Sequence, residues 1–504
     1  MIPALDRLSG LLEELALALP EQRWFGDKGR RVTGVLPLAV VWLLPLPRPL
    51  ALVLLEVQFA SGGSSRYHLA LALEPDDHED TAAPPLWSGL EEGTLQGWRA
   101  REALGEPQTL RAILEASSKG APLVDDGARL VLEVADGPPS LSPDEPIRPL
   151  GVEQSNTNLV IGDRLLVKLF RRAWPGPNPE VEMVGALTQA GFPAIAPVRG
   201  WIEVHSGLVT SNLALIQRYL PNGTDGFALA LTSLRDLEGD LLADADGEVP
   251  PPEVCRRAVL EQGGSFLPAA RELGQLTAAM HLSLASEASG LISGGAPLEQ
   301  AELAEFAAEA GRHLEGLLRV QEQRLEPLRV RAEPARAVFA GMAQLQDAGR
   351  KIRVHGDLHL GQLLRTDDGW HFLDFEGRPS RASEERRRPA SPLQDVAGML
   401  RSFDYAAAVA LRQQVHPDEA NARTLEPYGR AWAEVMREAF WVAYRSRPGI
   451  KALLPARAED ADRLRRALEL AQALYEVDYE LNARPDWVEI PLEGIARLVG
   501  GPSW

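Results

Sequence analysis

The stretch "RVHGDLHLGQLL", residues 353–364, decides how this chain can be interpreted. Its central residues lie between an apolar and basic segment and a pair of leucines, so we expect a loop between short elements. Asp357 is followed five residues later by Gln362. Transfer of a phosphoryl group to a hydroxyl needs a carboxylate that orients the hydroxyl, with a metal-binding amide a few residues along. We therefore predict that Asp357 is catalytic and that Gln362 is a metal ligand.

A second acidic segment, "FLDFEG" at residues 372–377, follows closely. It is typical of a strand that ends at Asp374, where a carboxylate would hold Mg²⁺ against nucleotide phosphates. The alternative is a pair of ordinary loop aspartates, and the combined spacing of the two segments disfavours it. A zinc pair at His355 and His359 is also disfavoured, because no third ligand is evident. We expect His355 to brace the loop through a hydrogen bond to the backbone.

A lysine within an apolar strand is the next candidate. Lys168 lies in "LLVKLF", residues 165–170, and a buried ammonium needs a partner. A helix should follow, with Asn178 as its N-cap and Pro179 at its first position. The alternative is an outward-facing lysine on an edge strand, and the scarcity of lysine, five among 52 basic residues, argues against it.

Candidates for the carboxylate partner of Lys168 are Glu180 and Glu182, on the helix expected after that strand. In kinase folds such a pair holds the lysine against the α- and β-phosphates of the nucleotide. The residues alone leave the choice between the two glutamates open.

Bulk properties restrict the class of protein. The chain has 504 residues, 45% of them hydrophobic, and a formal charge of −19, which disfavours nucleic acid as a partner. A single cysteine, Cys255, excludes a disulfide frame and a cysteine-based metal site. Four prolines and an arginine interrupt the apolar run at residues 36–57, so it predicts two strands and no membrane span. We expect a cytoplasmic enzyme.

The order of the patterns predicts the class of fold. Strand-like segments dominate up to about residue 220, and helical patterns rich in alanine, leucine, glutamate and arginine dominate after it. This segregation predicts an α+β fold. A helix is expected within residues 1–19, a first module at about 1–90, and a seam at 75–86.

Several segments together resemble a known family. "VHGDLHLGQLL", "FLDFEG" and "SPLQDVAGMLRSFDYAA" resemble the maltokinases, a branch of the aminoglycoside-phosphotransferase-like kinases. "RWFGDKGR" resembles their N-terminal cap, and "EQSNTN", "VKLFRR", "GPNPEVE", "RYLPNGTDGFALALTSLRDL" and "ARPDWVEIPL" resemble further segments in the same order. The resemblance implies a bilobal, protein-kinase-like fold. It implies a cap at 1–90, the rest of a nucleotide-binding N-lobe at 91–220, and a helical C-lobe at 221–504.

The resemblance also implies a nucleotide site that holds ATP and Mg²⁺ between the lobes, and it favours Glu182 as the partner of Lys168. In "EQSNTN", residues 153–158, the candidates for phosphate binding are Ser155, Asn156 and Thr157. Plain hairpin chemistry explains that segment equally well. In the connector "LIQRYL", residues 215–220, Gln217 and Tyr219 flank the backbone that an adenine edge would contact.

The acceptor candidates lie near the end of the chain, in "ALYEVDYELNARPDW", residues 473–487. Carboxylates suit sugar hydroxyls and aromatic rings suit sugar faces. The candidates, which also include a glutamate close to the metal aspartate, are Tyr475, Glu476, Tyr479, Glu480, Arg484 and Glu376. The alternative is an amphipathic helix with buried tyrosines and solvated glutamates.

The expected function is ATP-dependent phosphorylation of maltose at its anomeric hydroxyl, giving maltose 1-phosphate for trehalose, glycogen or α-glucan metabolism. The resemblance also implies a possible association with trehalose synthase. Two alternatives remain: a kinase for glucosamine or an aminoglycoside, and a non-catalytic kinase-like binding module. The intact set of Lys168, Asp357, Gln362 and Asp374 argues for an enzyme.

Overall fold

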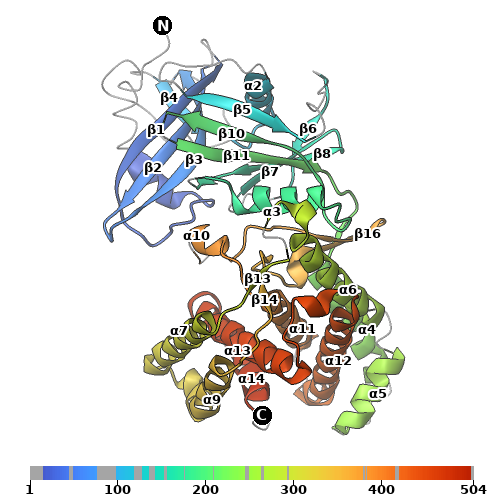
Figure 1. The fold of residues 1–504 in the computed structure, drawn as a ribbon. Helices are drawn as coiled ribbons and strands as arrows, with labels where there is room; N and C mark the ends of the chain where they lie inside the picture. Colours follow the sequence, from blue (N-terminus) through green and yellow to red (C-terminus); the bar gives the residue numbers. More distant parts are fainter. Residues whose placement is uncertain are drawn as a thin grey trace. The chain divides into compact units, whose positions relative to one another are not determined.

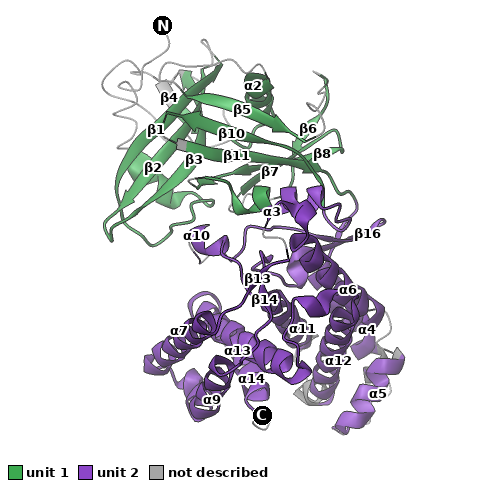
Figure 2. Ribbon diagram, in the orientation of Figure 1, with its two compact units in different colours: residues 1–182, 196–221 green, residues 183–195, 222–504 purple. Residues whose placement is uncertain are grey.

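The architecture was analysed in a computed structural model of the chain (Figure 1). The structure describes residues 15–500 apart from 45–48, 76–97, 119–127, 136–141, 143, 152–155, 175, 208, 244–248, 263–265, 292–293, 379–380, 382 and 415–418. The chain divides into two compact units, residues 1–182 with 196–221 and residues 183–195 with 222–504 (Figure 2). The first is rich in strands and the second in helices, which confirms the predicted α+β segregation.

Unit 1 contains two antiparallel sheets. The first has the order β1-β2-β3-β4, with β9 paired to β3, and the second has the order β5-β10-β11-β8-β7-β6. The strands of the first sheet are β1 (Val32–Leu44), β2 (Leu50–Phe59), β3 (Ser64–Pro75), β4 (Trp98–Glu102) and β9 (Arg172–Ala173). Those of the second are β5 (Arg129–Val134), β6 (Ile147–Pro149), β7 (Asn156–Ile161), β8 (Leu165–Phe170), β10 (Val198–Ser206) and β11 (Val209–Arg218).

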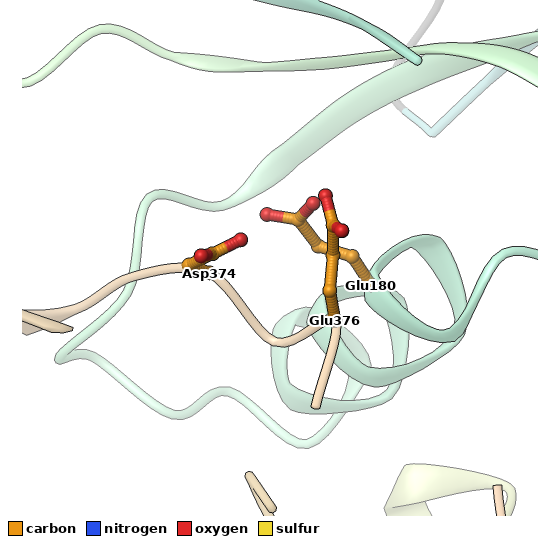
Figure 3. A group of neighbouring side chains, drawn as sticks. All are labelled: Glu180, Asp374 and Glu376. Carbon is orange, nitrogen blue, oxygen red and sulfur yellow. The ribbon is translucent and has the colours of Figure 1, made fainter. Parts of the chain in front are cut away.

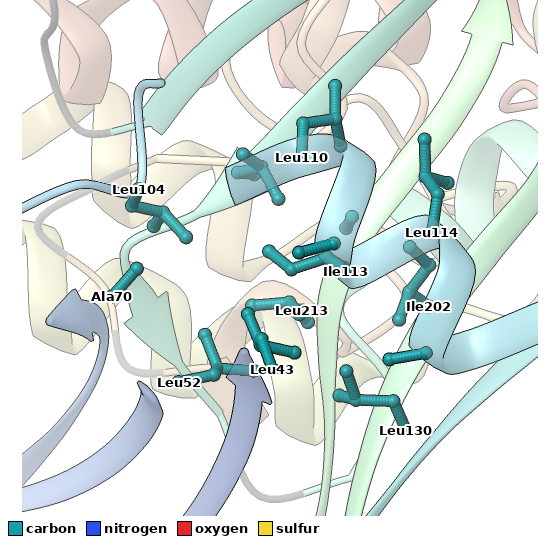
Figure 4. Close-up of a cluster of buried hydrophobic side chains, with 14 of the residues drawn as sticks. Leu43, Leu52, Ala70, Leu104, Leu110, Ile113, Leu114, Leu130, Ile202 and Leu213 are labelled. Carbon is teal, nitrogen blue, oxygen red and sulfur yellow. The ribbon is translucent and has the colours of Figure 1, made fainter. Parts of the chain in front are cut away.

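Strand β2 shows why its sequence is continuously apolar. Leu52 and Leu54 belong to one buried cluster, whereas Val53 and Leu55 belong to another. Successive side chains of a strand point to opposite faces, so a strand buried on both faces loses the alternation of apolar and polar residues. The first cluster also contains residues of the second sheet and of helix α2 (Pro107–Ser118) (Figure 4). The two sheets of unit 1 therefore share one core.

Helix α3 (Pro179–Gln189) begins as the sequence predicts. The backbone N–H of Glu180 donates to Asn178 Oδ1 at 2.8 Å, which satisfies one of the free amides of the first turn. Gly191, with φ of 69°, follows its end. The cap fixes where the helix starts and thus which of its glutamates faces the sheet.

Unit 2 is built around helix α11 (Leu393–Gln414), which packs against α4, α12, α13 and α14. Its longer helices are α4 (Gly226–Ala243), α5 (Pro252–Gln262), α6 (Leu267–Leu284), α7 (Gln300–Arg319), α9 (Ala332–Ala343), α12 (Glu419–Ser446), α13 (Ala458–Ala483) and α14 (Glu489–Leu498). Its short strands are β12 (Thr224–Asp225), β13 (Ala296–Pro297), β14 (Arg350–Lys351), β15 (Leu363–Thr366) and β16 (Gly369–Phe372). Strands β12, β15 and β16 form a small sheet that carries the loops of the candidate site.

Two expectations fall outside the described residues. Most of the helix expected at 1–19 and nearly all of the seam expected at 75–86 cannot be compared with the structure. Among the described residues, no helix combines the length and the apolar character needed to cross a membrane.

Candidate active site

The loop around Asp357 is held by the first turn of helix α11. Asp395 accepts hydrogen bonds from the backbone N–H groups of His355 and Gly356, both at 2.8 Å. His281 Nε2 lies 3.1 Å from the same carboxylate. Burial alone would raise the pKa of Asp395, but the hydrogen bond from His281 and the neighbouring donors bring it below its ordinary value. A charged, immobile carboxylate therefore fixes the loop.

Sequence reasoning missed both Asp395 and His281. Asp395 stood only inside a segment quoted for its resemblance, and His281 lies more than 70 residues before the loop. The expectation for His355 is confirmed, because its Nε2 atom bonds the backbone oxygen of Leu373 at 2.9 Å. No group of three or more metal-binding side chains among the described residues includes His355 or His359.

Gly398, on helix α11, has no side chain, and this lets the loop around Asp357 approach the helix. A Cβ atom at Gly398 would lie 2.4 Å from the backbone oxygen of Leu358, much closer than such atoms can come. Leu358 directly follows Asp357. The glycine thus allows the helix and the catalytic loop to pack against each other.

The two expected metal ligands lie side by side in unit 2. Gln362 Nε2 donates to Asp374 Oδ2 at 3.3 Å, and the backbone N–H of Leu373 donates to the backbone oxygen of Gln362 at 2.9 Å. Asp374 has a φ of 61°, a conformation that is rare outside glycine and concentrates at functional sites. With its NH₂ group directed at Asp374, Gln362 keeps its amide oxygen available. Carboxylate and amide oxygens fit Mg²⁺.

Glu376 belongs with this pair. Its carboxylate oxygen lies within 4.8 Å of that of Asp374, and Figure 3 shows both residues on the segment after β16, with Glu180 on helix α3. Glu376 is not among the described residues that line the acceptor cavity considered below. The expectation that Glu376 reaches the sugar stays a prediction, and the structure places its carboxylate beside that of Asp374.

Lys168 lies on a central strand of unit 1, since β8 is paired on one side with β11 and on the other with β7. The edge-strand alternative is therefore wrong. Its Nζ atom lies 2.7 Å from Glu180 Oε2, and the Glu180 side chain is only 3% exposed. The preference for Glu182 is corrected: residues two apart on a helix point about 200° apart, and it is Glu180 that faces the strand.

The remaining candidates for phosphate binding are Ser155, Asn156 and Thr157. Ser155 lies outside the described residues. Thr157 is 2% exposed, and its hydroxyl accepts a hydrogen bond from Arg171 Nε at 2.9 Å, while its phosphate-binding role stays a prediction. Asn156 lies half-buried at the start of β7. Its role stays a prediction.

The connector residues are fixed within unit 1. Gln217 Nε2 donates to the backbone oxygen of Ala196 at 2.8 Å. The backbone N–H of Tyr219 donates to the backbone oxygen of Arg164 at 2.8 Å, and Arg148 lies against its ring. These bonds set the course of the backbone that was expected to meet adenine, and that contact stays a prediction.

Unit 2 contains a cavity of about 630 Å³ with Asp357 in its wall. It also receives residues from helix α13 and the segment after it that the sequence singled out, namely Tyr475, Glu476, Tyr479, Glu480 and Arg484. The described residues that sequence reasoning missed there include Asp225, Phe227, Arg378, Gln394, Tyr405, Gln472 and Trp487. The structure thus brings the predicted catalytic residue and the predicted acceptor residues to one cavity. A volume of this size suits a small organic ligand.

The two glutamates of this wall already have protein partners. Glu476 Oε2 accepts from Arg401 Nε at 2.9 Å and Nη2 at 2.8 Å, and its Oε1 accepts from Gln472 at 3.2 Å. Glu480 accepts from Arg484 at 2.8 and 3.0 Å and from the Tyr405 hydroxyl at 3.2 Å. Their expected role as direct sugar ligands stays a prediction, and in the structure both carboxylates are paired with arginines.

The amphipathic alternative for helix α13 is also wrong, because the pattern is reversed. Glu480 is 1% exposed, whereas Tyr479 is 50% exposed. Arg401, almost fully buried on α11, explains why Glu476 also turns inward, whereas Glu480 is held by Tyr405 and Arg484. Burial alone would lower the pKa of Arg401, but the carboxylates of Glu476 and Asp404 raise it above its ordinary value. The helix can thus turn acids inward and leave an aromatic ring free.

Comparison with known proteins shows to which protein family the chain belongs. The model of the phosphotransferase enzyme family matches residues 261–437, and that of the maltokinase N-terminal cap domain matches residues 19–105. A glucosamine kinase from Streptacidiphilus jiangxiensis is 30% identical over 351 residues, which cover 68% of this chain and 70% of the relative. The chain belongs to the phosphotransferase enzyme family. Its resemblance to the maltokinase branch is confirmed by the cap domain.

A further relative and two solved structures are also similar to this phosphotransferase. A glucosamine kinase from Mycolicibacterium smegmatis is 29% identical over 70% of this chain and 79% of its own length. The structure of a glucosamine kinase in complex with glucosamine, ADP and inorganic phosphate superposes with a TM-score of 0.64 and 24% identity, covering 99% of this chain and 100% of that one. A second crystal form gives a TM-score of 0.64 and 23% identity over 92% and 94% of the two chains. The predicted bilobal, kinase-like fold is confirmed.

Proposed function

We propose that this phosphotransferase transfers the γ-phosphoryl group of ATP to the anomeric hydroxyl of maltose and forms maltose 1-phosphate. The observation that carries the proposal is the cavity beside Asp357, in whose wall Glu476 and Glu480 are paired with arginines and to which Tyr475 and Tyr479 add their rings. Such a wall suits an uncharged, hydroxyl-rich sugar. The maltokinase-type cap at residues 19–105 supports the same acceptor.

Asp357 is the proposed catalytic residue. Within the part of the chain that the structure describes, no side chain or amide hydrogen-bonds its carboxylate, which is thus available to a substrate hydroxyl. A carboxylate is a weak base toward a sugar hydroxyl in the ground state. Asp357 therefore orients the anomeric hydroxyl first and takes its proton as the oxygen–phosphorus bond forms.

Lys168 and Glu180 are the proposed phosphate-binding pair. Glu180 holds the ammonium at 2.7 Å, so that Lys168 can neutralise the α- and β-phosphates. Gln362 and Asp374 are the proposed Mg²⁺ ligands, and the bound ion would stabilise the negative charge on the transferred phosphoryl group.

A second candidate acceptor is glucosamine, because the two curated relatives of 30% and 29% identity are glucosamine kinases. The two candidates differ in charge, since glucosamine carries an ammonium group where a neutral sugar carries a hydroxyl. The expected association with trehalose synthase stays a prediction, which co-purification of the two proteins would test.

An acceptor panel tests the proposal. Maltose, glucose, glucosamine and an aminoglycoside are each incubated with Mg²⁺-ATP, and ADP release is followed by a coupled assay. Phosphorus NMR of the product then locates the phosphate on the anomeric carbon or elsewhere. Turnover of maltose to an anomeric phosphate is expected. Turnover of glucosamine without turnover of maltose would replace the first candidate by the second, and no turnover of any acceptor would refute both.

A further inference from the structure

We infer that Arg378 sets the charge preference of the acceptor cavity, disfavouring acceptors with an ammonium group and so selecting neutral sugars. This inference rests on the proposed sugar-kinase function and assigns a specificity-determining role to one residue. Sequence reasoning gave Arg378 no role, and the structure places it in the wall of the cavity that also contains Asp357.

The guanidinium of Arg378 is held by two contacts. It lies over the ring of Tyr475, with its central carbon 4.2 Å from the ring centroid. It also donates a hydrogen bond to Gln472 Oε1, and Gln472 in turn donates to Glu476, the residue held by Arg401. Arg378 is thus the cavity-lining end of a chain of hydrogen bonds that reaches the buried interior of unit 2. A side chain held in this way keeps its charge at a fixed place in the cavity.

These contacts leave the charge of Arg378 in place. The amide oxygen of Gln472 and the ring of Tyr475 are both uncharged. Burial lowers the pKa of Arg378, with Arg381 adding to the effect and Asp357 and Glu476 opposing it. An arginine side chain in a protein keeps its proton at neutral pH, so the guanidinium remains charged.

Both glutamates that line the cavity have their charges compensated, and Asp225 has a hydrogen-bond partner. Glu480 is paired with Arg484, and Glu476 is paired with Arg401. Asp225 Oδ1 accepts the backbone N–H of Ala228 at 2.9 Å. An acceptor that approaches Asp357 therefore finds a reactive carboxylate and a fixed guanidinium, but no further carboxylate without a partner among the described residues of the wall.

The chemistry of donors and acceptors turns this arrangement into selectivity. A guanidinium and an ammonium group are both hydrogen-bond donors without an acceptor, and they carry the same charge. A sugar hydroxyl can accept a hydrogen bond from Arg378, whereas a sugar ammonium cannot and is repelled. In a partly buried site the repulsion of like charges is stronger than at an exposed surface.

Glucose and glucosamine provide a matched pair of probes, because they differ by one hydroxyl and one ammonium group. Their affinities for the full chain, with ADP and Mg²⁺ present, are measured by calorimetry. For the wild type we expect glucose to bind about tenfold more tightly than glucosamine. Arg378→Gln should remove this preference, and Arg378→Glu should reverse it.

Two controls separate charge from shape. Arg378→Lys keeps the positive charge without the planar group, and it should retain the preference for glucose. Arg463→Gln, on helix α13 but 65% exposed at its side chain, should leave both affinities unchanged. Thermal unfolding of each variant establishes that it is folded. The preference of the wild type should also shrink as rising pH deprotonates glucosamine.

The inference is overturned if wild-type protein binds glucosamine at least as tightly as glucose. It is equally overturned if Arg378→Glu gains no affinity for glucosamine relative to glucose, including the case in which neither sugar binds. Failure of the proposed function is a separate result, because it is decided by the turnover of maltose by the wild type. A wild type that discriminates by charge but phosphorylates no sugar would retain this inference and remove the proposed function.

Discussion

The catalytic loop and the acceptor wall of unit 2 hold their carboxylates in opposite ways. In the loop, main-chain amides and a buried aspartate fix the backbone, and the Asp357 carboxylate itself is left for a substrate. In the wall, arginines bind the carboxylates of Glu476 and Glu480 directly. A group that must react is therefore positioned through its backbone, whereas a group that must shape a surface is neutralised through its side chain.

Replacing the reactive carboxylate tests this contrast with the largest expected effect. Asp357→Asn should lower kcat by about 10³- to 10⁴-fold while leaving ATP affinity nearly unchanged, because the amide can no longer take the proton. Steady-state turnover and nucleotide titration measure the two quantities. Turnover within a few fold of the wild type would remove Asp357 from the mechanism.

Removing the central arginine of the wall should instead affect stability. Arg401→Met leaves Glu476 buried with a lost partner and should reduce the free energy of unfolding by about 3–5 kcal/mol. Urea unfolding followed by tryptophan fluorescence measures it. The double variant Arg401→Met with Glu476→Leu should recover most of the loss, since an apolar pair needs no charge compensation. If the double variant is as unstable as the single one, the wall does more than neutralise charge.

Replacement of Asp395, which holds the loop around Asp357, should have an effect of intermediate size. Asp395→Asn turns one acceptor of the loop amides into a donor, and it should lower kcat/KM by about tenfold to a hundredfold, or about 1–3 kcal/mol. The activity measurement is paired with unfolding between pH 5 and pH 3.

The pH dependence distinguishes a brace from a merely structural residue. The pKa of Asp395 is lowered by folding, so its contribution to stability is present above its unfolded pKa of ~3.9 and is lost as the pH falls through the lower folded value. The wild type should therefore lose more stability in acid than Asp395→Asn. Equal acid sensitivity of the two proteins would contradict the assigned charge.

The exposed ring of the wall should give the smallest effect. Tyr479→Ala should raise the KM for the sugar by about threefold to tenfold with little change in kcat, because the ring offers contact area and no charge. Tyr479→Phe should retain wild-type KM, since the ring is kept. A large fall in kcat for Tyr479→Ala would mean that the wall also orients the reacting hydroxyl.

The sequence was most informative where the chemistry is local. The spacing of Gln362 and Asp374 was sufficient to predict that they lie together, because a short hairpin joins them. The cap of helix α3 and the strand around Lys168 were predictable for the same reason.

Long-range partners were beyond such reasoning. Whether Glu180 or Glu182 faces Lys168 depends on the rotation of a helix against a sheet, and the sequence gives no measure of it. The inward turn of Glu476 depends on Arg401 and that of Glu480 on Tyr405, and each partner lies 75 residues earlier on another helix. Arg378 was overlooked because its neighbours in space, Gln472 and Tyr475, come from a distant helix.

The core shared by the two sheets of unit 1 has a consequence for engineering this protein. Leu52 and Leu54 of the first sheet pack in the same apolar cluster as Ile202 and Leu213 of the second. A truncated protein without the first sheet would expose the apolar face of the second sheet to water. Such a protein should aggregate. The N-terminal sheet therefore cannot be removed without loss of the shared core. Transfer of this sheet to another kinase would also require transfer of the apolar face of the second sheet against which it packs.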